Sequence, residues 1–242
     1  MDAPAIRFSG VSKRFGAVQA LSDVTLEVAR GSCIGLAGEN GAGKTTLLKC
    51  LLDFVQPEQG SVEIAGRPSG SLSSREHLAY LPERFSAPHY LTGREFVAML
   101  ASLSGTVPGP QDIERAAAEL DLPAGALDRP ARTLSKGTGQ KLGLAACFLS
   151  GRQLLVLDEP MSGLDPRARV RVKDRIRATV AEGRTVLFTS HALADIEEIC
   201  DRMAVLHAGR LAFSGTPAGL RGRFGGETLE RSYLRCVEGH VR

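Results

Sequence analysis

The chain has 242 residues, of which 43% are hydrophobic and 24% are charged, and its formal net charge is +3 at pH 7. This composition is that of a globular protein with a sizeable core, and the charge is too small to indicate a nucleic-acid partner. No apolar run approaches the ~18 residues that a membrane span requires, and residues 1–4 lack the basic and apolar regions of a signal peptide. The five cysteines show no Cys-x-x-Cys spacing, so we expect reduced thiols and a cytoplasmic protein.

The first thirty residues predict an antiparallel sheet. Residues 6–11 alternate apolar and polar side chains, as an edge strand would, and residues 20–28 give a second alternating run after a turn at residues 15–16. Phe15, at that turn, is either a core residue or a flat platform on which an adenine ring could stack. Its position alone leaves both interpretations open.

Residues 38–45 fit the phosphate-binding P-loop pattern G-x-x-x-x-G-K-[ST], between an apolar strand at 33–37 and a helical run at 46–52. Glycines let the backbone fold around an anion, and a helix N-terminus favours negative charge there. Lys44 would contact the β- and γ-phosphates, and the Thr45 hydroxyl would bind Mg²⁺. A chance glycine turn is the alternative, which the strand–loop–helix context disfavours. The expected nucleotide contacts are Gly38, Glu39, Asn40, Gly41, Ala42, Gly43, Lys44, Thr45 and Thr46.

The middle of the chain predicts a helical insertion. Short strands at residues 61–64 and 78–82 precede a helical pattern that runs from residue 91 to 150. Thr92 and Glu95 fit a capping box, and a second helix is expected over residues 113–120, with Asp112 ahead of it. We interpret this section as a helical subdomain inserted into an α/β core.

Residues 152–160 predict a strand buried on both faces, with Asp158 and Glu159 at its carboxyl end. Ligands bind at that end of parallel strands, so Asp158 would hold Mg²⁺ and Glu159 would orient or deprotonate the attacking water. A helix cap or a surface pair is the alternative. A second buried strand, residues 184–191, ends in His191, which could donate a hydrogen bond to a γ-phosphate.

The remaining elements carry less chemistry. Residues 167–181 predict an arginine-rich helix whose charges we interpret as a solvated face, and residues 192–200 predict another helix. Residues 203–207 and 210–213 predict a hairpin. From residue 221 onward we expect a short polar tail, to which we assign no role.

Taken together, these motifs resemble the nucleotide-binding subunit of an ATP-binding cassette (ABC) transporter, over about residues 6–220. The distinguishing stretch, residues 134–141 (Leu-Ser-Lys-Gly-Thr-Gly-Gln-Lys), resembles the family's signature sequence. In the family, the serine and backbone amides at this helix start contact the γ-phosphate of an ATP held by a partner subunit, as helix N-termini bind anions. By this resemblance Ser135, Gly137 and Gln140 would bind nucleotide.

Three further positions match the family. Residues 162–165 resemble the D-loop, whose Asp165 would lie near the partner's nucleotide. His191 matches the switch histidine, and Phe15 matches the aromatic stacking position, which is usually a tyrosine.

Two departures stand out. Glu83 replaces the usual glutamine that touches Mg²⁺ and water, and because a carboxylate is also a hard oxygen ligand, we expect Glu83 to serve both the metal and catalysis. Leu-Pro-Glu at residues 81–83 resembles subunits that serve exporter-like (ABC-2 type) permeases. In the signature, Lys136 and Gly139 differ from the commoner residues, and we expect activity to be retained.

The resemblance implies one ABC ATPase domain of the α/β class, with a P-loop core, a mixed sheet and an N-terminal antiparallel β subdomain. Residues 1–84 and 151–220 would form this part, residues 85–150 the helical subdomain, and residues 221–242 the tail. ATP and Mg²⁺ are the implied ligands. The implied partners are a second ABC ATPase subunit, in a homodimer or heterodimer, and integral membrane permease subunits that hold the chain at the cytoplasmic face of the membrane.

The region that docks the permease is expected at residues 84–94, and export is favoured over import. The cargo is not identified, because its site would lie in the membrane subunits. A GTPase would need an Asn-Lys-x-Asp motif, and a chromosome ATPase a long coiled coil or zinc cysteines after Glu83; the sequence has neither. A soluble ABC-type ATPase with a regulatory or assembly role and no cargo stays open.

Overall fold

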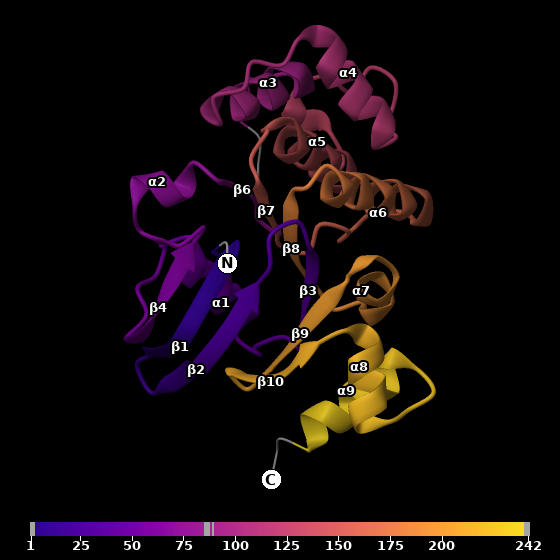
Figure 1. Ribbon diagram of the computed structural model, residues 1–242. Helices are drawn as coiled ribbons and strands as arrows, with labels where there is room; N and C mark the ends of the chain where they lie inside the picture. Colours follow the sequence, from indigo (N-terminus) through magenta and orange to yellow (C-terminus); the bar gives the residue numbers. More distant parts are fainter. Residues whose placement is uncertain (1–2, 85–87, 89, 240–242) are drawn as a thin grey trace.

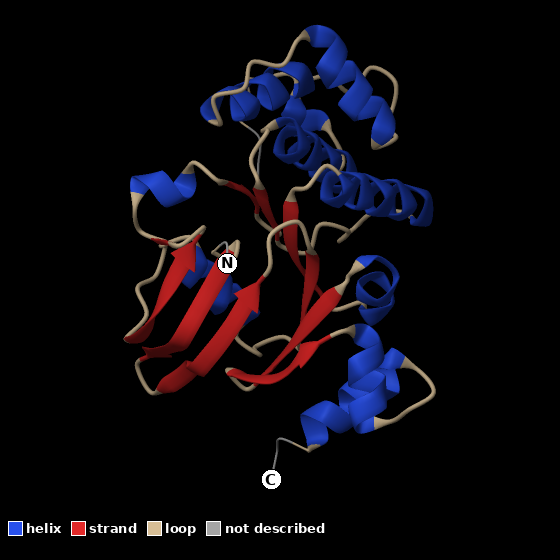
Figure 2. Cartoon of the chain, in the orientation of Figure 1, coloured by secondary structure: helices blue, strands red, loops and turns tan. Residues whose placement is uncertain are grey.

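Two sheets with helices packed around them make up the computed structural model, which describes residues 3–84, 88 and 90–239 (Figure 1). Figure 2 shows strands gathered in the middle and left of the molecule, with helices above and at the lower right. Among the described residues, no helix combines the length and apolar character that crossing a membrane requires.

The first sheet is antiparallel and has the order β2-β1-β4-β5. β1 (Ile6–Phe15) pairs with β2 (Val18–Val28) on one side and with β4 (Gln59–Ile64) on the other, and β5 (Arg67–Pro68) extends β4. The prediction of an edge strand at residues 6–11 is therefore wrong. Alternation reports that one face of a strand is buried, as it is for Ile6, Phe8 and Val11, and it does not report the strand's place in the sheet.

The second sheet carries the P-loop strand at its centre. β3 (Cys33–Ala37) lies parallel to β8 (Thr185–Ser190) and β9 (Arg202–His207), and β7 (Leu154–Leu157) and β6 (Leu78–Leu81) continue the sheet in parallel beyond β8. β10 (Arg210–Gly215) joins β9 antiparallel, which confirms the predicted hairpin. The mixed α/β fold predicted from the sequence is confirmed.

The parallel strands separate two cores. Ile34 and Leu36 of β3 face a cluster that includes the antiparallel sheet and helix α1 (Lys44–Leu51), whereas Cys33 and Ala37 face a cluster of helices. Successive side chains of a strand point to opposite faces, so the apolar runs in this sheet reflect burial on both sides.

A helical layer lies at the top of Figure 1. It contains α3 (Gly93–Leu103), α4 (Pro110–Glu119), the 3-10 turn η1 (Ala131–Thr133) and α5 (Lys136–Leu149), after the short α2 (Leu72–Arg75). The Thr92–Glu95 capping box is confirmed. α4 begins earlier than the expected residue 113, because Asp112 lies inside its first turn, where its carboxylate accepts the Gly109 N–H at 3.0 Å.

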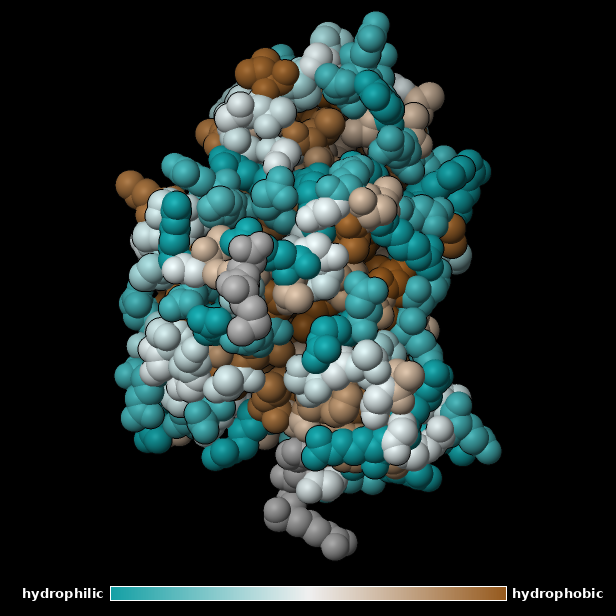
Figure 3. All heavy atoms as spheres, viewed as in Figure 1, coloured by the Kyte–Doolittle hydropathy of each residue, from teal (hydrophilic) through white to brown (hydrophobic). Residues whose placement is uncertain are grey.

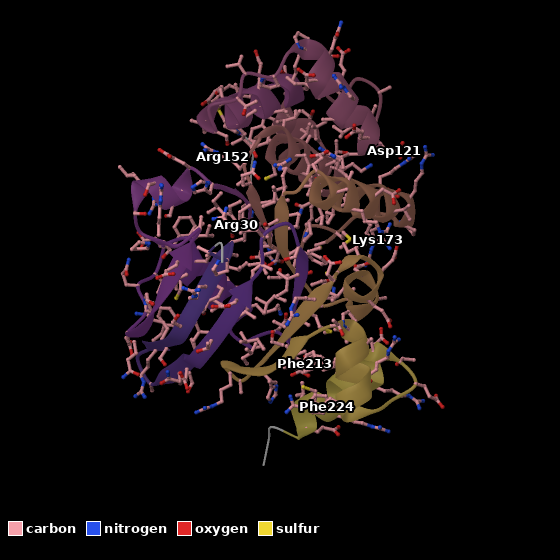
Figure 4. All side chains as sticks on the ribbon, viewed as in Figure 1. Arg30, Asp121, Arg152, Lys173, Phe213 and Phe224 are labelled. Atoms are coloured by element: carbon pink, nitrogen blue, oxygen red, sulfur yellow. The ribbon has the colours of Figure 1, made fainter. Side chains whose placement is uncertain are left out.

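The arginine-rich helix α6 (Pro166–Ala181) is more than a solvated face. Two acids of α7 (Leu193–Ile199) form ion pairs with α6. Asp195 pairs with Arg169 and Lys173, and Glu198 pairs with Lys173 and Arg177. Figure 4 shows Lys173 between the two helices, where it is 9% exposed. These charges fasten α7 to α6, a contact that the sequence does not predict.

The region expected as a tail is folded. α8 (Pro217–Phe224) and α9 (Leu229–Glu238) pack against the second sheet, and Leu229, Tyr233 and Cys236 belong to the main core. Phe213 of β10 and Phe224 of α8 meet edge to face, with ring centroids 6.2 Å apart (Figure 4). The last turns of the described chain therefore contribute to the domain's core.

Candidate nucleotide-binding and catalytic site

The P-loop is closed by its own lysine. The Lys44 Nζ donates hydrogen bonds to the carbonyl oxygens of Gly38 at 2.5 Å and Glu39 at 3.1 Å, so the loop is already curled before any ligand is considered. Gly43, the N-cap of α1, has φ of 107°, and a Cβ there would lie 2.7 Å from the Ala20 carbonyl oxygen. Only glycine fits this position, because both the torsion and the close approach exclude a side chain.

A cavity of about 220 Å³ opens beside this loop. Four segments contribute to it: the start of β2, the P-loop with the first turn of α1, the second residue after β6, and the acids after β7. Its lining is Val18, Gln19, Ala20, Glu39, Asn40, Gly41, Gly43, Lys44, Thr45, Thr46, Glu83, Asp158 and Glu159. The structure thus brings together most of the predicted P-loop contacts and the three acids expected to serve the metal and catalysis, Glu83, Asp158 and Glu159.

Two predicted P-loop residues lie behind this surface. Gly38 contributes its carbonyl oxygen to Lys44, and Ala42 is only 4% exposed. Their expected contact with nucleotide stays a prediction, which concerns backbone N–H groups and not side chains.

Asp158 and Glu159 differ in environment although they are adjacent. Asp158 is 6% exposed, and its Oδ1 accepts a hydrogen bond from the Thr189 hydroxyl at 2.6 Å. The same hydroxyl links the two acids, because it also accepts a hydrogen bond from the Glu159 backbone N–H at 2.9 Å. Glu159 has φ of 48°, and its Oε2 lies 2.9 Å from the Nδ1 of His191.

The electrostatics of the cavity suit a charged ligand. Burial raises the pKa of Asp158, the Thr189 hydrogen bond opposes that shift, and the charge of Glu83 adds to it. Burial lowers the pKa of Lys44, and the nearby carboxylates, Glu159 foremost, oppose this. A carboxylate and an ammonium are therefore held close together in a partly dry site, where a phosphate and a cation would each find a partner.

The oxygen ligands at this cavity fit Mg²⁺, which also binds water and phosphate, better than a metal ion whose ligands are all protein side chains. Within the described part of the chain, no group of three or more His, Cys, Asp or Glu side chains is arranged to hold a metal. The Thr45 hydroxyl, Asp158 and Glu83 share the cavity. Mg²⁺ characteristically takes one or two carboxylates and completes its shell with water and substrate phosphates, and this is what these residues offer.

Phe15 is not a core residue. It is 48% exposed at the end of β1, with the Lys13 Nζ 5.4 Å from its ring centroid. It pairs across the turn with Val18, which lines the cavity. The core interpretation is therefore wrong. Over the described residues the cavity lining does not include Phe15, so its stacking on a nucleotide base stays a prediction.

The signature residues lie apart from this cavity. Ser135 is the N-cap of α5, where its Oγ accepts the Thr138 N–H at 3.2 Å. A Cβ on Gly137 would lie 3.1 Å from the Gly163 carbonyl oxygen, so the signature and the D-loop are neighbours. Asp165 caps α6 by accepting the Ala168 N–H at 2.9 Å, and this hydrogen bond lowers the pKa of Asp165.

Gln140 differs from the other signature residues because its side chain is buried within the chain. It is 3% exposed, and its Nε2 faces the carbonyl oxygens of Pro160 at 3.3 Å and Glu159 at 3.5 Å. The structure therefore turns this side chain toward the chain's own acidic loop and does not bring it to the nucleotide cavity.

Sequence reasoning missed three residues. Thr189 is fully buried between the acids, Gln19 lines the cavity, and Tyr233 of α9 hydrogen-bonds with the backbone of Glu39 in the P-loop. Burial raises the pKa of Tyr233, and the charge of Glu39 adds to the shift. A polar residue two places before His191 is the one available signal for Thr189; the other two contacts depend on long-range packing.

The comparisons with known proteins agree with this geometry. Residues 21–162 match the family described as ABC transporter. An uncharacterized ABC transporter ATP-binding protein of Nostoc sp. is 40% identical over 82% of this chain and 60% of the relative. The Nod factor export ATP-binding protein I of Rhizobium sp. is 33% identical over 91% of this chain and 73% of the relative.

A solved ATP-binding subunit of an ABC transporter superposes with a TM-score of 0.84 at 31% identity, covering 96% of this chain and 99% of the other. The chain spans about 60% of the length of the Nostoc relative. With the P-loop, the paired acids, the signature and the match of residues 21–162, the chain belongs to the ABC transporter family, as an ATP-binding protein.

Proposed function

We propose that this chain binds ATP with Mg²⁺ in the P-loop cavity and hydrolyses it to ADP and phosphate. Lys44 and the loop amides bind the phosphates, while Thr45, Asp158 and Glu83 hold the metal, which when bound neutralises charge on the phosphates. Glu159 acts as general base toward the attacking water, and His191 orients its carboxylate and donates to the γ-phosphate.

One observation carries this proposal. Glu159 and the P-loop Lys44 line a single cavity, and His191 lies beside it with its Nδ1 2.9 Å from the Glu159 carboxylate, although the three come from separate stretches of the chain. A surface acid pair or a helix cap would not need a histidine and a phosphate loop beside it. Glu159 is mostly buried, with a side chain that is 15% exposed, as a base shielded from bulk water should be.

Binding is tested by Lys44→Ala in the purified chain, with Mg²⁺-ATP affinity measured by calorimetry and phosphate release measured in parallel. Removing the charge and the bonds that close the loop should abolish measurable binding and turnover. Lys49→Ala, which changes an exposed lysine on the same helix, is the matched control and should behave as the unaltered chain. Equal affinity in Lys44→Ala and Lys49→Ala would contradict the proposal.

The position of the signature supports a head-to-tail dimer. Over the described residues, the lining of the P-loop cavity includes neither Ser135 nor Gly137. In the family these residues complete a site on a second subunit, and the exposed N-terminus of α5 is suited to an anion presented from outside. Each ATP would then lie between the P-loop of one cassette and the signature of the other.

We further propose that ATP hydrolysis drives export through separate membrane permease subunits, at the cytoplasmic face of the membrane. A groove of about 170 Å³ supports a docking site for a permease's cytoplasmic helix; it is lined by Leu51, Leu52, Phe54, Ile64, Ser69, Arg75, Leu78 and Tyr80. Phe54 is 66% exposed and Leu72 of α2 is 83% exposed, and Figure 3 shows a small brown group at the upper left edge, where Figure 1 places α2. The predicted docking stretch, residues 84–94, falls partly outside the described residues, since 85–87 and 89 are not described.

Transport is tested by recovering the tagged chain from gently solubilised native membranes. Unaltered chain should bring down a polytopic membrane protein, and Phe54→Asp should lose it while keeping ATP binding. Leu103→Asp, at an exposed apolar position on α3 outside the groove lining, is the control and should keep the partner. Recovery without any membrane protein would favour the soluble regulatory ATPase instead.

A further inference from the structure

A single buried hydroxyl joins the two acids of the site. Thr189 lies near the end of β8 and is 0% exposed. Its Oγ1 donates to Asp158 Oδ1 at 2.6 Å and accepts the Glu159 backbone N–H at 2.9 Å. A threonine hydroxyl has one donor, and here both its donor and an acceptor lone pair are used on adjacent residues.

Glu159 needs such support because its backbone conformation is unfavourable. Its φ of 48° is in the left-handed region, which a residue with a Cβ rarely adopts and keeps only where its surroundings hold it there. The Thr189 bond is made to the N–H of the strained residue itself, and so it fixes the peptide plane on the N-terminal side of that torsion. Gln140 faces the carbonyl oxygen on the other side at 3.5 Å.

The other end of Glu159 is held from the same strand. His191 follows Thr189 by two residues, and its Nδ1 lies 2.9 Å from Glu159 Oε2. β8 thus supplies one contact to the main chain of Glu159 and, just beyond its end, one to the carboxylate. Of the two, Thr189 is completely shielded from water, whereas the His191 side chain is 72% exposed.

We propose that Thr189 is a positioning residue for ATP hydrolysis, whose hydroxyl sets the orientation of Glu159 relative to Asp158 without touching the nucleotide. This inference rests on the proposed function, since it assigns Glu159 the role of base. It separates Thr189 from the phosphate-binding residues: losing the hydroxyl should slow the chemical step and leave ATP affinity intact, because the P-loop contacts do not involve it and Asp158 keeps the carboxylate that would hold the metal.

Thr189→Val and Thr189→Ser make the matched pair. Valine keeps the β-branched shape that a buried strand favours and removes only the hydroxyl, whereas serine keeps the hydroxyl. For Thr189→Val we expect kcat to fall roughly 10- to 100-fold, as expected for a displaced catalytic group, while KM and the Kd for Mg²⁺-ATP stay within about twofold. Thr189→Ser should recover most of the turnover.

The inference is overturned if Thr189→Val hydrolyses ATP at the normal rate while Glu159→Gln does not, and in that case the proposed function stands. Absence of hydrolysis by the unaltered chain would instead remove the proposed function itself. Thr189→Val combined with Glu159→Gln should be no slower than Glu159→Gln alone; a further loss would show a role that does not act through Glu159.

Folding is controlled by thermal melting of each variant. Should Thr189→Val fail to fold, Thr189→Ala takes its place with the same expectations. If neither folds while Thr189→Ser does, or if KM rises as steeply as kcat falls, the hydroxyl has a general structural role and the inference is wrong.

Discussion

The two adjacent acids that follow β7 have different surroundings. Asp158 is buried and bonded to Thr189, so a cation nearby would relieve the cost of its charge. Glu159 turns out of the strand direction at φ 48° and meets a histidine. These surroundings suit Asp158 to the proposed role of holding the metal and Glu159 to the proposed role of positioning a water.

Phe15 offers a test of nucleotide recognition at the level of one ring. Phe15→Ala should weaken ATP binding, because base–aromatic stacking contributes ~1–3 kcal/mol, and calorimetry would measure the change in Kd. Thermal stability should hardly change, since the side chain is half exposed. Phe15→Tyr keeps a flat ring and should keep the affinity. An unchanged Kd in Phe15→Ala would exclude the stacking role.

At the scale of elements, the ion pairs between α6 and α7 predict an acid-sensitive contact. The hydrogen bond from Lys173 lowers the pKa of Glu198, with burial opposing and Arg177 assisting. A depressed carboxyl pKa stabilises the fold above the unfolded value, about 4.3 for Glu, and this stabilisation is lost as pH falls through the folded pKa. Glu198→Gln should lower Tm at pH 7 by no more than about 3 °C, since such pairs contribute under ~1 kcal/mol.

The pH dependence of Tm gives a second test of the Glu198 ion pairs. Between pH 7 and pH 3, the Tm of the unaltered chain should fall more than that of Glu198→Gln, because the variant has no charge to lose at this position. Glu76→Gln, at an exposed glutamate, is the control and should follow the unaltered chain. Parallel Tm curves for Glu198→Gln and the unaltered chain would contradict the assignment.

The sequence predicts those elements that are specified by residues close together in the chain. The P-loop, the Thr92 cap and the β9–β10 hairpin are specified by neighbouring residues, and all three are confirmed. The place of β1 within its sheet depends on β4, some fifty residues away, and alternation carries no record of it. α9 has helical spacing at Leu229, Tyr233 and Cys236, but its arginines gave the stretch a polar average that hid the apolar face.

The same distinction holds within the site. Lys44, Asp158 and Glu159 are recognisable because each stands in a motif of consecutive residues. Thr189 and Tyr233 are not, since the first depends on β7 lying beside β8 and the second on α9 reaching the P-loop. Contacts of this kind are set by sheet order and helix docking, which a single sequence does not specify.

For the whole molecule, the proposed placement of each ATP between two cassettes predicts dimerisation that depends on ATP. Glu159→Gln with Mg²⁺-ATP should shift in light scattering from 25.7 kDa to twice that mass. Adding Ser135→Asp should prevent this, because aspartate still caps α5 yet repels the partner's γ-phosphate. Ser135→Asn is the neutral control and should still dimerise. A dimer with Ser135→Asp would exclude the signature from the interface.

Steady-state phosphate release by the unaltered chain and by Glu159→Gln, with ATP affinity measured on the same preparations, tests the central claim most directly. A general base typically contributes ~10²–10⁴-fold to a rate. We therefore predict that Glu159→Gln binds Mg²⁺-ATP as tightly as the unaltered chain and releases phosphate more slowly by about 10²-fold or more. Near-normal hydrolysis by Glu159→Gln would contradict the assignment of Glu159 as the base.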